Sequence, residues 1–186
     1  MSYVIAIDGR CAAGKTTLAN RISELTGAGV VHMDDFFLPM ELRTKVRLEE
    51  PGGNVHYERF AEEVLPFLKQ GRNFSYQRFD CSTMKLGSIC KVTFADIIVV
   101  EGAYSCHPYL GSYMNLKVFA DIDKELQLQR ILRRNGQERL EIFKRKWIPL
   151  EEAYFSKYNI QQKADMIIGS EARAEQIVRK CREEIC

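Results

Sequence analysis

The sequence predicts an α/β protein built on a five-stranded parallel sheet flanked by helices. Short apolar runs alternate with longer amphipathic segments along most of the 186 residues. This alternation is typical of buried parallel strands joined by crossover helices. A glycine-rich stretch, GRCAAGKTT, stands between the first apolar run and the first amphipathic segment. The hydrophobic fraction of 46% and the charged fraction of 28% are ordinary for a globular protein.

The expected strands are short apolar runs rich in Val, Ile and Phe. They lie at 3–7, 29–33, 96–100, 116–122 and 164–169. Helical spacing of apolar residues predicts helices at 15–25, 59–69, 123–134, 138–162 and 171–183. Because strands and helices alternate in order, the sheet is expected to be parallel and covered on both faces.

Two stretches interrupt this alternation. Residues 38–57 are charged and then glycine-rich, which predicts a mobile loop on the acceptor side of the site. Residues 74–95 predict an inserted β-hairpin, in which FSYQRFD and ICKVTF are joined by a polar turn near Gly87. The sequence has no internal repeat and no linker, so we expect a single domain, 1–186, with two insertions.

Bulk composition narrows the classes of function. The net charge of +2 predicts no general attraction to nucleic acid or to a membrane surface. No apolar run is long enough to span a bilayer, and we expect no signal peptide. The cysteines have no C-x-x-C spacing, so we expect free thiols, no zinc site and a cytoplasmic location. They stand at positions 11, 81, 90, 106, 181 and 186.

The stretch from Gly9 to Thr16 fits the phosphate-binding pattern G-x-x-x-x-G-K-[ST]. Chance gives this pattern in about one chain in a hundred of this length. Its glycines let backbone N–H groups surround a phosphate, and the helix that follows adds a partial positive charge. Lys15 is expected to reach the β- and γ-phosphates of ATP, and the Thr16 hydroxyl to bind Mg²⁺. The expected ATP contacts from the loop are Gly9, Arg10, Cys11, Ala12, Ala13, Gly14, Lys15, Thr16 and Thr17.

The reaction class follows from what surrounds the phosphate loop. A GTPase switch needs an N-K-x-D guanine reader, which is missing, and a motor ATPase usually has an Asp-Glu pair where this chain has only Glu101. A small-molecule kinase instead needs a carboxylate near the acceptor hydroxyl and a cationic lid over the phosphates. The sequence offers candidates for both.

The lid candidate is RILRRNG, within residues 130–138. Arg130 shares a helix face with Arg133 and with Arg134, and the helix is expected to stop at Asn135-Gly136. Arginines above a transferring phosphoryl group stabilise its charge. The alternative interpretation is a solvated basic helix end.

The carboxylate candidates are Asp34 and Asp35, directly after the second strand. Ligands in parallel α/β sheets sit beyond the carboxyl ends of the strands, where Asp8 and Glu101 are also expected. At least one of the two aspartates is therefore expected to be catalytic. The alternative for this pair is a turn or a helix cap.

The stretches GRCAAGKTTLA, HMDDFFLP, VVEGAYSCHP and RILRRNG resemble the uridine kinase, phosphoribulokinase and bacterial pantothenate kinase family over nearly the whole chain. The likeness is greatest to its small bacterial uridine-kinase-like branch. It implies a P-loop kinase fold with an arginine lid, and ATP-dependent phosphorylation of a primary hydroxyl on a small molecule. By this resemblance, Asp34, Lys15, Arg133 and Arg134 are catalytic, and Glu101 and Asp34 lie near Mg²⁺. Gly169 to Arg173 are expected to pack on adenine.

The acceptor half of the resemblance is weaker. Uridine-cytidine kinases have N-F-D-H-P where this chain has NVHYERF, so His56 replaces the aspartate that holds ribose. Phe79 and Met84 replace their base-reading tyrosine and histidine. The expected acceptor contacts are Asp34, His56, Tyr57, Phe79 and Asp80. A nucleoside such as uridine or cytidine, another small alcohol, and a regulator without phosphotransfer all remain open, as does a homo-oligomeric state.

Five residues near these motifs have a plain structural interpretation. His56 is equally well a solvated loop residue, and Cys11 either fills a small position or acts as a redox switch. Trp147 and Tyr154 are expected in the core. His107, followed by proline, is expected to shape a turn.

Overall fold

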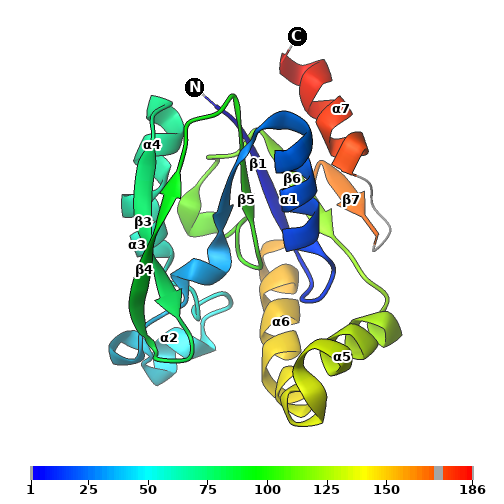
Figure 1. Ribbon diagram of the computed structural model, residues 1–186. Helices are drawn as coiled ribbons and strands as arrows, with labels where there is room; N and C mark the ends of the chain where they lie inside the picture. Colours follow the sequence, from blue (N-terminus) through cyan, green and yellow to red (C-terminus); the bar gives the residue numbers. More distant parts are fainter. Residues whose placement is uncertain (1, 170–173, 186) are drawn as a thin grey trace.

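The computed structural model, which describes residues 2–169 and 174–185, contains the predicted parallel sheet (Figure 1). Its strands are β1 (Tyr3–Gly9), β2 (Gly29–His32), β5 (Ile97–Glu101), β6 (Leu116–Ala120) and β7 (Met166–Ile168). They are ordered β2-β5-β1-β6-β7, and every neighbouring pair is parallel. The predicted strands are confirmed to within a few residues at each end.

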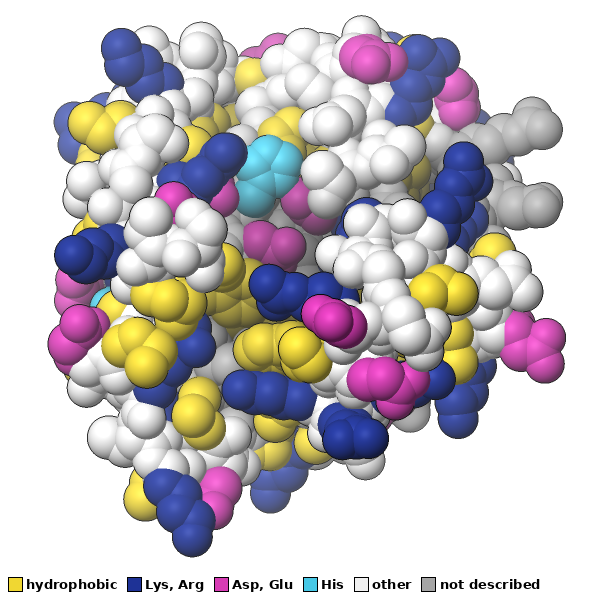
Figure 2. All heavy atoms as spheres, turned by 60° about the horizontal axis from the view of Figure 1, so that its bottom comes forward, with side chains coloured by type: hydrophobic (Ala, Val, Ile, Leu, Met, Phe, Trp, Pro, Cys, Tyr) yellow, Lys and Arg dark blue, Asp and Glu magenta, His cyan; other side chains and the backbone are white. Residues whose placement is uncertain are grey.

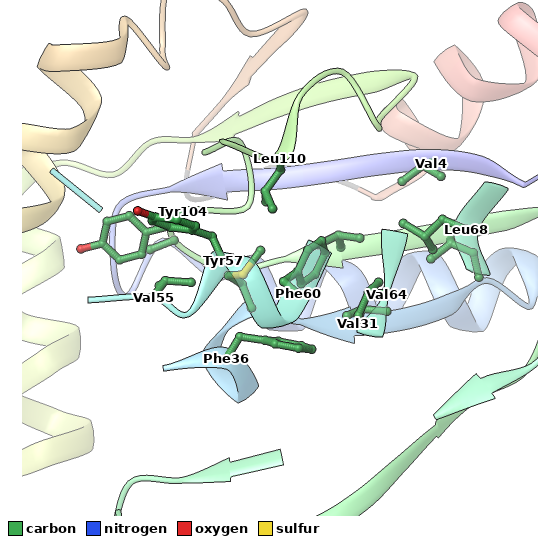
Figure 3. Close-up of a cluster of buried hydrophobic side chains, with 14 of the residues drawn as sticks. Val4, Val31, Phe36, Val55, Tyr57, Phe60, Val64, Leu68, Tyr104 and Leu110 are labelled. Atoms are coloured by element: carbon green, nitrogen blue, oxygen red, sulfur yellow. The ribbon is translucent and has the colours of Figure 1, made fainter. Parts of the chain in front are cut away.

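Helices cover both faces of the sheet (Figure 1). They are α1 (Lys15–Thr26), α2 (Lys45–Glu49), α3 (Tyr57–Glu63), α4 (Leu65–Gln70), α5 (Lys124–Ile142), α6 (Ile148–Tyr158) and α7 (Ala174–Ile185). One core cluster joins the sheet to α1 and α7, and the other joins it to α3, α4 and α6. In the second cluster Phe60, Val64 and Leu68 lie in a row on the side of the sheet that carries Val4 and Val31 (Figure 3).

The predicted helix at 59–69 is two helices. Val64 has φ −119° and ψ −53° and separates α3 from α4, and Pro66 occupies the first turn of α4. Proline is accepted in a first turn because its missing N–H has no partner there, whereas inside one long helix it breaks a hydrogen bond.

The predicted hairpin is present, but its turn is not near Gly87. Strand β3 (Phe74–Asp80) pairs antiparallel with β4 (Lys85–Val92), so the turn spans 81–84. Asp80 closes the turn early because its carboxylate accepts hydrogen bonds from the Ser82 N–H at 2.8 Å and the Ser82 hydroxyl at 2.6 Å. Met84, with φ 57°, completes the turn.

The stop predicted at Asn135-Gly136 is a break inside α5. Gly136 has φ 80° and ψ 173°, after which the chain resumes a helical course. A π-helical turn, Phe143–Trp147, then leads into α6, which ends at Tyr158 rather than at 162 because Asn159 is left-handed, with φ 55°. The predicted helix at 138–162 is thus divided between three elements.

The segment 38–57 has more structure than the expected loop. It contains a 3₁₀ turn, Met40–Leu42, and the short helix α2. Arg47 holds its far end by donating to the carbonyls of Gly53 and Val55, both at 2.9 Å, and to Glu58 at 2.6 Å. The mobility of residues 38–57 stays a prediction. Among the described helices, none is both long and apolar enough to cross a membrane.

Candidate functional site

The carboxyl ends of β1, β2 and β5 open into a cleft of about 1510 Å³. Figure 2 shows this face hollowed at its centre, where acidic side chains and a histidine lie, with Lys and Arg side chains around them. The α2 segment lies on one side of this end of the sheet and α5 on the other (Figure 1). Pockets for one small ligand typically measure roughly 300–1,000 Å³, so the cleft has room for two substrates.

The phosphate loop forms the floor of the cleft. A Cβ on Gly9, which has φ 129°, would lie 2.2 Å from the Ala120 carbonyl oxygen, so only glycine lets the loop pass this close to β6. The predicted residues from Cys11 to Thr17 line the cleft. Gly9 and Arg10 are not in the lining, and the Arg10 guanidinium instead donates to Asp121 at 2.6 Å and to Glu152 at 2.8 Å.

The Lys15 side chain is held by hydrogen bonds to the phosphate loop. Its Nζ donates to the carbonyl oxygens of Gly9 at 2.7 Å and Arg10 at 2.8 Å, and the side chain is buried. Both of these hydrogen-bond partners are neutral carbonyls, so the ammonium can still pair with an anionic ligand. The loop and Lys15 together form a site for phosphate groups.

A metal site fits beside the loop. The Thr16 hydroxyl donates to Glu101 Oε1 at 3.1 Å, and Glu101 is buried at the end of β5. Hydroxyl and carboxylate oxygens suit Mg²⁺, which takes its remaining ligands from phosphates and water. Accordingly, the described residues contain no group of three or more His, Cys, Asp or Glu side chains that holds a metal without such help.

His32 joins this site, although no sequence motif pointed to it. Its Nδ1 lies 2.6 Å from Glu101 Oε1, and this hydrogen bond raises the pKa of His32. The interaction competes with a metal for the same carboxylate oxygen. The available sequence signal was that the histidine ends the second strand, two positions before the aspartate pair.

Asp34 lines the cleft from the 3₁₀ turn Met33–Phe36, which follows β2. A Cβ on Gly102, which has φ 132°, would lie 2.8 Å from the Met33 Cβ and 3.5 Å from Asp34 Oδ1. Glycine at 102 therefore lets the turn lie against the end of β5. The Asp34 carboxylate is open to water within the cleft, yet protein surrounds it on the other sides. Desolvation, followed by the nearby charge of Glu101, raises its pKa.

Asp35 points away from the cleft and into the hairpin. Its carboxylate accepts a hydrogen bond from the Tyr76 hydroxyl at 2.9 Å and pairs with Arg78 at 2.9 Å. Both aspartates lie on the same 3₁₀ turn, Met33–Phe36. Asp35 thus ties the hairpin to the turn that carries Asp34.

The arginines of the predicted lid separate into two groups. Arg130 lines the cleft and donates to the Ala12 carbonyl at 3.1 Å, and Arg134 lines the cleft beside Asn135. Arg133 is exposed and does not line the cleft. Three further cations that the sequence analysis did not single out, Arg139, Arg145 and Lys146, extend the basic rim.

The structure does not bring the other predicted acceptor residues into the cleft. Phe79 is buried, Asp80 closes the hairpin turn, and neither lines the cleft. Tyr57 is buried beneath the guanidinium of Arg47, 3.9 Å from its ring centroid. His56 is half-buried outside the lining, and burial lowers its pKa. Contact of these four with an acceptor stays a prediction that this geometry does not favour.

Glu151 is a site residue with no local sequence signal. It comes from α6, is buried at 7% exposure, and accepts a hydrogen bond from the Cys11 N–H of the phosphate loop at 2.9 Å. Burial raises the pKa of Glu151 to about 7. Burial, with the charge of Glu151, also raises the pKa of the Cys11 thiol to about 12. A thiol of this kind is scarcely ionised at neutral pH, which disfavours the redox interpretation.

Four further sequence predictions concern Trp147, Tyr154, His107 and the expected adenine contact. Trp147 lines the cleft, so its predicted place in the core is wrong. Tyr154 is fully buried, as predicted, and its hydroxyl donates to Asp8 at 2.8 Å. His107 shapes a turn, as predicted, because its Nδ1 accepts the Tyr109 N–H at 3.2 Å. Gly169 lines the cleft, whereas the rest of the expected adenine contact, residues 170–173, lies outside the described residues.

We expect Glu151→Gln to stabilise the protein at pH 8 and to have little effect at pH 5. The pKa of Glu151 is about 7 in the folded protein and 4.5 ordinarily. The folded state therefore favours the protonated carboxyl, whose contribution to the free energy of unfolding is complete below pH 4.5 and is lost as pH rises through 7. Glutamine imitates the protonated acid and keeps an acceptor for the Cys11 N–H. The free energy of unfolding should therefore rise by about 1–3 kcal/mol at pH 8. Urea unfolding at both pH values tests this, and an equal difference at the two would contradict it.

Comparison with known proteins agrees with this geometry. The family model described as the phosphoribulokinase / uridine kinase family matches residues 4–171. A uridine kinase from Chloroflexus aurantiacus is 30% identical over 146 residues, which are 73% of this chain and 69% of that protein. Uridine kinase-like protein 4 from Arabidopsis thaliana is 28% identical over 144 residues, 73% of this chain and 30% of that protein. The chain thus spans about 30% of the length of several curated relatives that it matches.

Two solved structures share the fold. A possible uridine kinase from Bacillus stearothermophilus has a TM-score of 0.66 at 22% identity, covering 90% of this chain and 88% of that one. A putative fructose transport system kinase from Silicibacter has a TM-score of 0.68 at 18% identity, covering 90% and 89%. At such identities the likeness shows a P-loop kinase fold alone. The match of the family model over most of the sequence shows that the chain belongs to the phosphoribulokinase / uridine kinase family.

Proposed function

We propose that this protein transfers the γ-phosphate of ATP to a hydroxyl of a small molecule. One observation carries the proposal: Asp34 lies beside the Thr16–Glu101 pair, in the cleft whose floor is the phosphate loop. Membership in a family of kinases supports the same reaction class. The acceptor that the names of the relatives favour is a nucleoside such as uridine or cytidine.

The phosphate loop supports ATP binding. Its amides and Lys15 would hold the β- and γ-phosphates, and Arg130 and Arg134 would lie over them from α5. Thr16 and Glu101 would hold Mg²⁺, which when bound neutralises charge between the phosphates. These residues supply the positioning and the fixed charges on which phosphoryl transfer depends.

Asp34 supports an acceptor hydroxyl. A carboxylate at this place can accept the alcohol proton and direct its oxygen toward the γ-phosphate. Partial desolvation strengthens it as a base, because the raised pKa means a greater affinity for the proton. The same group also lies close enough to Glu101 to share in holding the metal through water.

We expect Arg134→Ala to lower kcat by at least about tenfold and Arg133→Ala to leave it nearly unchanged. Arg134 lines the cleft, where it would meet charge that grows in the transition state, whereas Arg133 faces solvent. The two are neighbours of identical chemistry, so Arg133→Ala is the matched control. Steady-state ADP release measures both, and an unchanged kcat in both variants would make the two arginines a solvated helix end.

The proposed function is tested by ADP formation against a panel of hydroxyl compounds. Uridine, cytidine, sugar phosphates and pantothenate are each added to enzyme and MgATP, and water alone is the control. ADP that appears only with an alcohol supports a kinase. Tight MgATP binding with no acceptor-dependent ADP would instead support a regulator that binds nucleotide without transferring phosphate.

A further inference from the structure

We propose that the acceptor carries an anionic group, a carboxylate or a phosphate ester, and that Arg43 binds it. The inference rests on the proposed kinase function and deepens it by naming the class of acceptor. It differs from a nucleoside acceptor, which is neutral. Arg43 lies on the segment between the 3₁₀ turn Met40–Leu42 and α2, and it lines the same cleft as Asp34.

The Arg43 guanidinium is held in a fixed orientation, but its Nη hydrogen-bond donors are unused in the described structure. Its Nε donates to the Leu38 carbonyl oxygen at 2.7 Å, which fixes the plane of the group. Within the described part of the chain, its two Nη atoms have no hydrogen-bond or ion-pair partner. The nearby Arg47 differs, because its guanidinium is taken up by Glu58 and by backbone carbonyls. A fixed guanidinium with a free edge has the geometry for a carboxylate or phosphate.

Asp34 is the one carboxylate that lines the cleft from the described segment carrying Arg43, and it does not pair with Arg43. Apart from Asp34 and Arg43 itself, the residues that line the cleft from the segment 34–54 and from the hairpin turn are uncharged: Phe37, Leu48, Asn54, Cys81 and Met84. No ion pair within 4.0 Å joins Arg43 to Asp34. When an acceptor fills the cleft and displaces water, the Arg43 charge needs a partner, which a neutral acceptor does not provide.

The charge of the whole cleft also favours an anionic acceptor. Among the described lining residues, eight are Lys or Arg and four are Asp or Glu, whereas the whole chain has 27 and 25. The cationic excess is therefore concentrated where substrates bind. Lys15, Arg130 and Arg134 are assigned above to the phosphates of ATP, whereas Arg43 belongs to the segment that leads into α2, which lies across this end of the sheet from α5 (Figure 1). Its charge is left for the second substrate.

The direct test measures the binding of inorganic phosphate by calorimetry. The protein is first saturated with Mg²⁺ and a non-hydrolysable ATP analogue. The analogue fills the phosphate loop, so added phosphate reports on the acceptor end. We expect wild-type protein to bind phosphate and Arg43→Gln to bind it at least about tenfold more weakly. Glutamine can still donate to the Leu38 carbonyl, and Arg43→Lys, which retains a cation, should lose less. Lys45→Gln is the matched control, because Lys45 is 88% exposed on the same segment.

Matched acceptors form the second arm. Glycerate is compared with glycerol, pantothenate with panthenol, and fructose 6-phosphate with fructose, with uridine and cytidine beside them. We expect the anionic member of a pair to have the higher kcat/KM, and Arg43→Gln to reduce that preference at least about tenfold. Carboxylates and phosphates are separated by which pair responds.

The inference is overturned if phosphate does not bind to the analogue complex, or if Arg43→Gln protein binds phosphate as well as wild type does. It is also overturned if uridine or cytidine is the preferred acceptor and Arg43→Gln leaves kcat/KM for that nucleoside unchanged. Failure of the proposed function looks different. In that case the protein does not bind the Mg²⁺ analogue complex, or no hydroxyl compound of either charge stimulates ADP release.

Discussion

Asp34→Asn is expected to lower kcat by about 10²- to 10⁴-fold while leaving MgATP binding largely intact. Asparagine has the same shape but cannot take the alcohol proton. The groups that hold ATP remain, since Lys15 and the loop amides do not contact Asp34 by hydrogen bonds in the described structure. Single-turnover kinetics with a working acceptor measures the transfer step, and calorimetry measures the affinity for MgATP.

Asp35→Asn is the matched control for this prediction. Asp35 is the next residue, and its carboxylate contacts Tyr76 and Arg78 in the hairpin rather than the cleft. We expect this change to reduce the free energy of unfolding by about 1–2 kcal/mol, because a half-exposed ion pair is lost, and to leave kcat within a few-fold. Equal loss of kcat in the two variants, or loss of ATP binding with Asp34→Asn, would remove Asp34 from the role of base.

Lys15→Ala is expected to weaken MgATP binding by at least about tenfold and to abolish measurable turnover. The Lys15 ammonium is the buried cation of the phosphate loop, and it would meet both the β- and γ-phosphates. Its loss removes charge-assisted hydrogen bonds in the bound state and further stabilisation as charge develops during transfer. Calorimetry and ADP release measure the two effects.

Lys15→Met is the companion variant, because it fills the volume of the lysine stem without the charge. If the alanine protein is poorly folded, the methionine protein separates lost charge from lost packing. Normal MgATP affinity together with normal turnover in a folded Lys15→Met protein would show that the loop is not a nucleotide site.

The half of the candidate site around the phosphate loop was predictable because its signals are local. A phosphate loop is one continuous stretch, and Asp34 follows, and Glu101 ends, a strand whose apolar run is visible in the sequence. Parallel strands bring their carboxyl ends to one edge, so three short patterns were enough to place these groups together. Glu151 lacked any such signal. It reaches Cys11 only because α6 packs beside the loop, 140 positions away in sequence.

The acceptor half was not predictable because turns and packing decide which side chains face the cleft. The hairpin turn closes at Asp80 and Ser82 rather than near Gly87, which places Met84, and not Phe79, at the cleft. Arg43 and Arg47 lie on one charged segment and look equivalent in the sequence. Only the folded segment shows that Arg47 is used internally and that Arg43 is not.

The central claim is that the γ-phosphate moves to an organic hydroxyl and not to water. The most direct measurement follows a radioactive γ-phosphate from MgATP in the presence of the acceptor that best stimulates ADP release. We expect the label to appear in an organic phosphate ester with wild-type protein and to fall at least about a hundredfold with Asp34→Asn. Label found only in inorganic phosphate, or an ester formed equally well by Asp34→Asn, would contradict it.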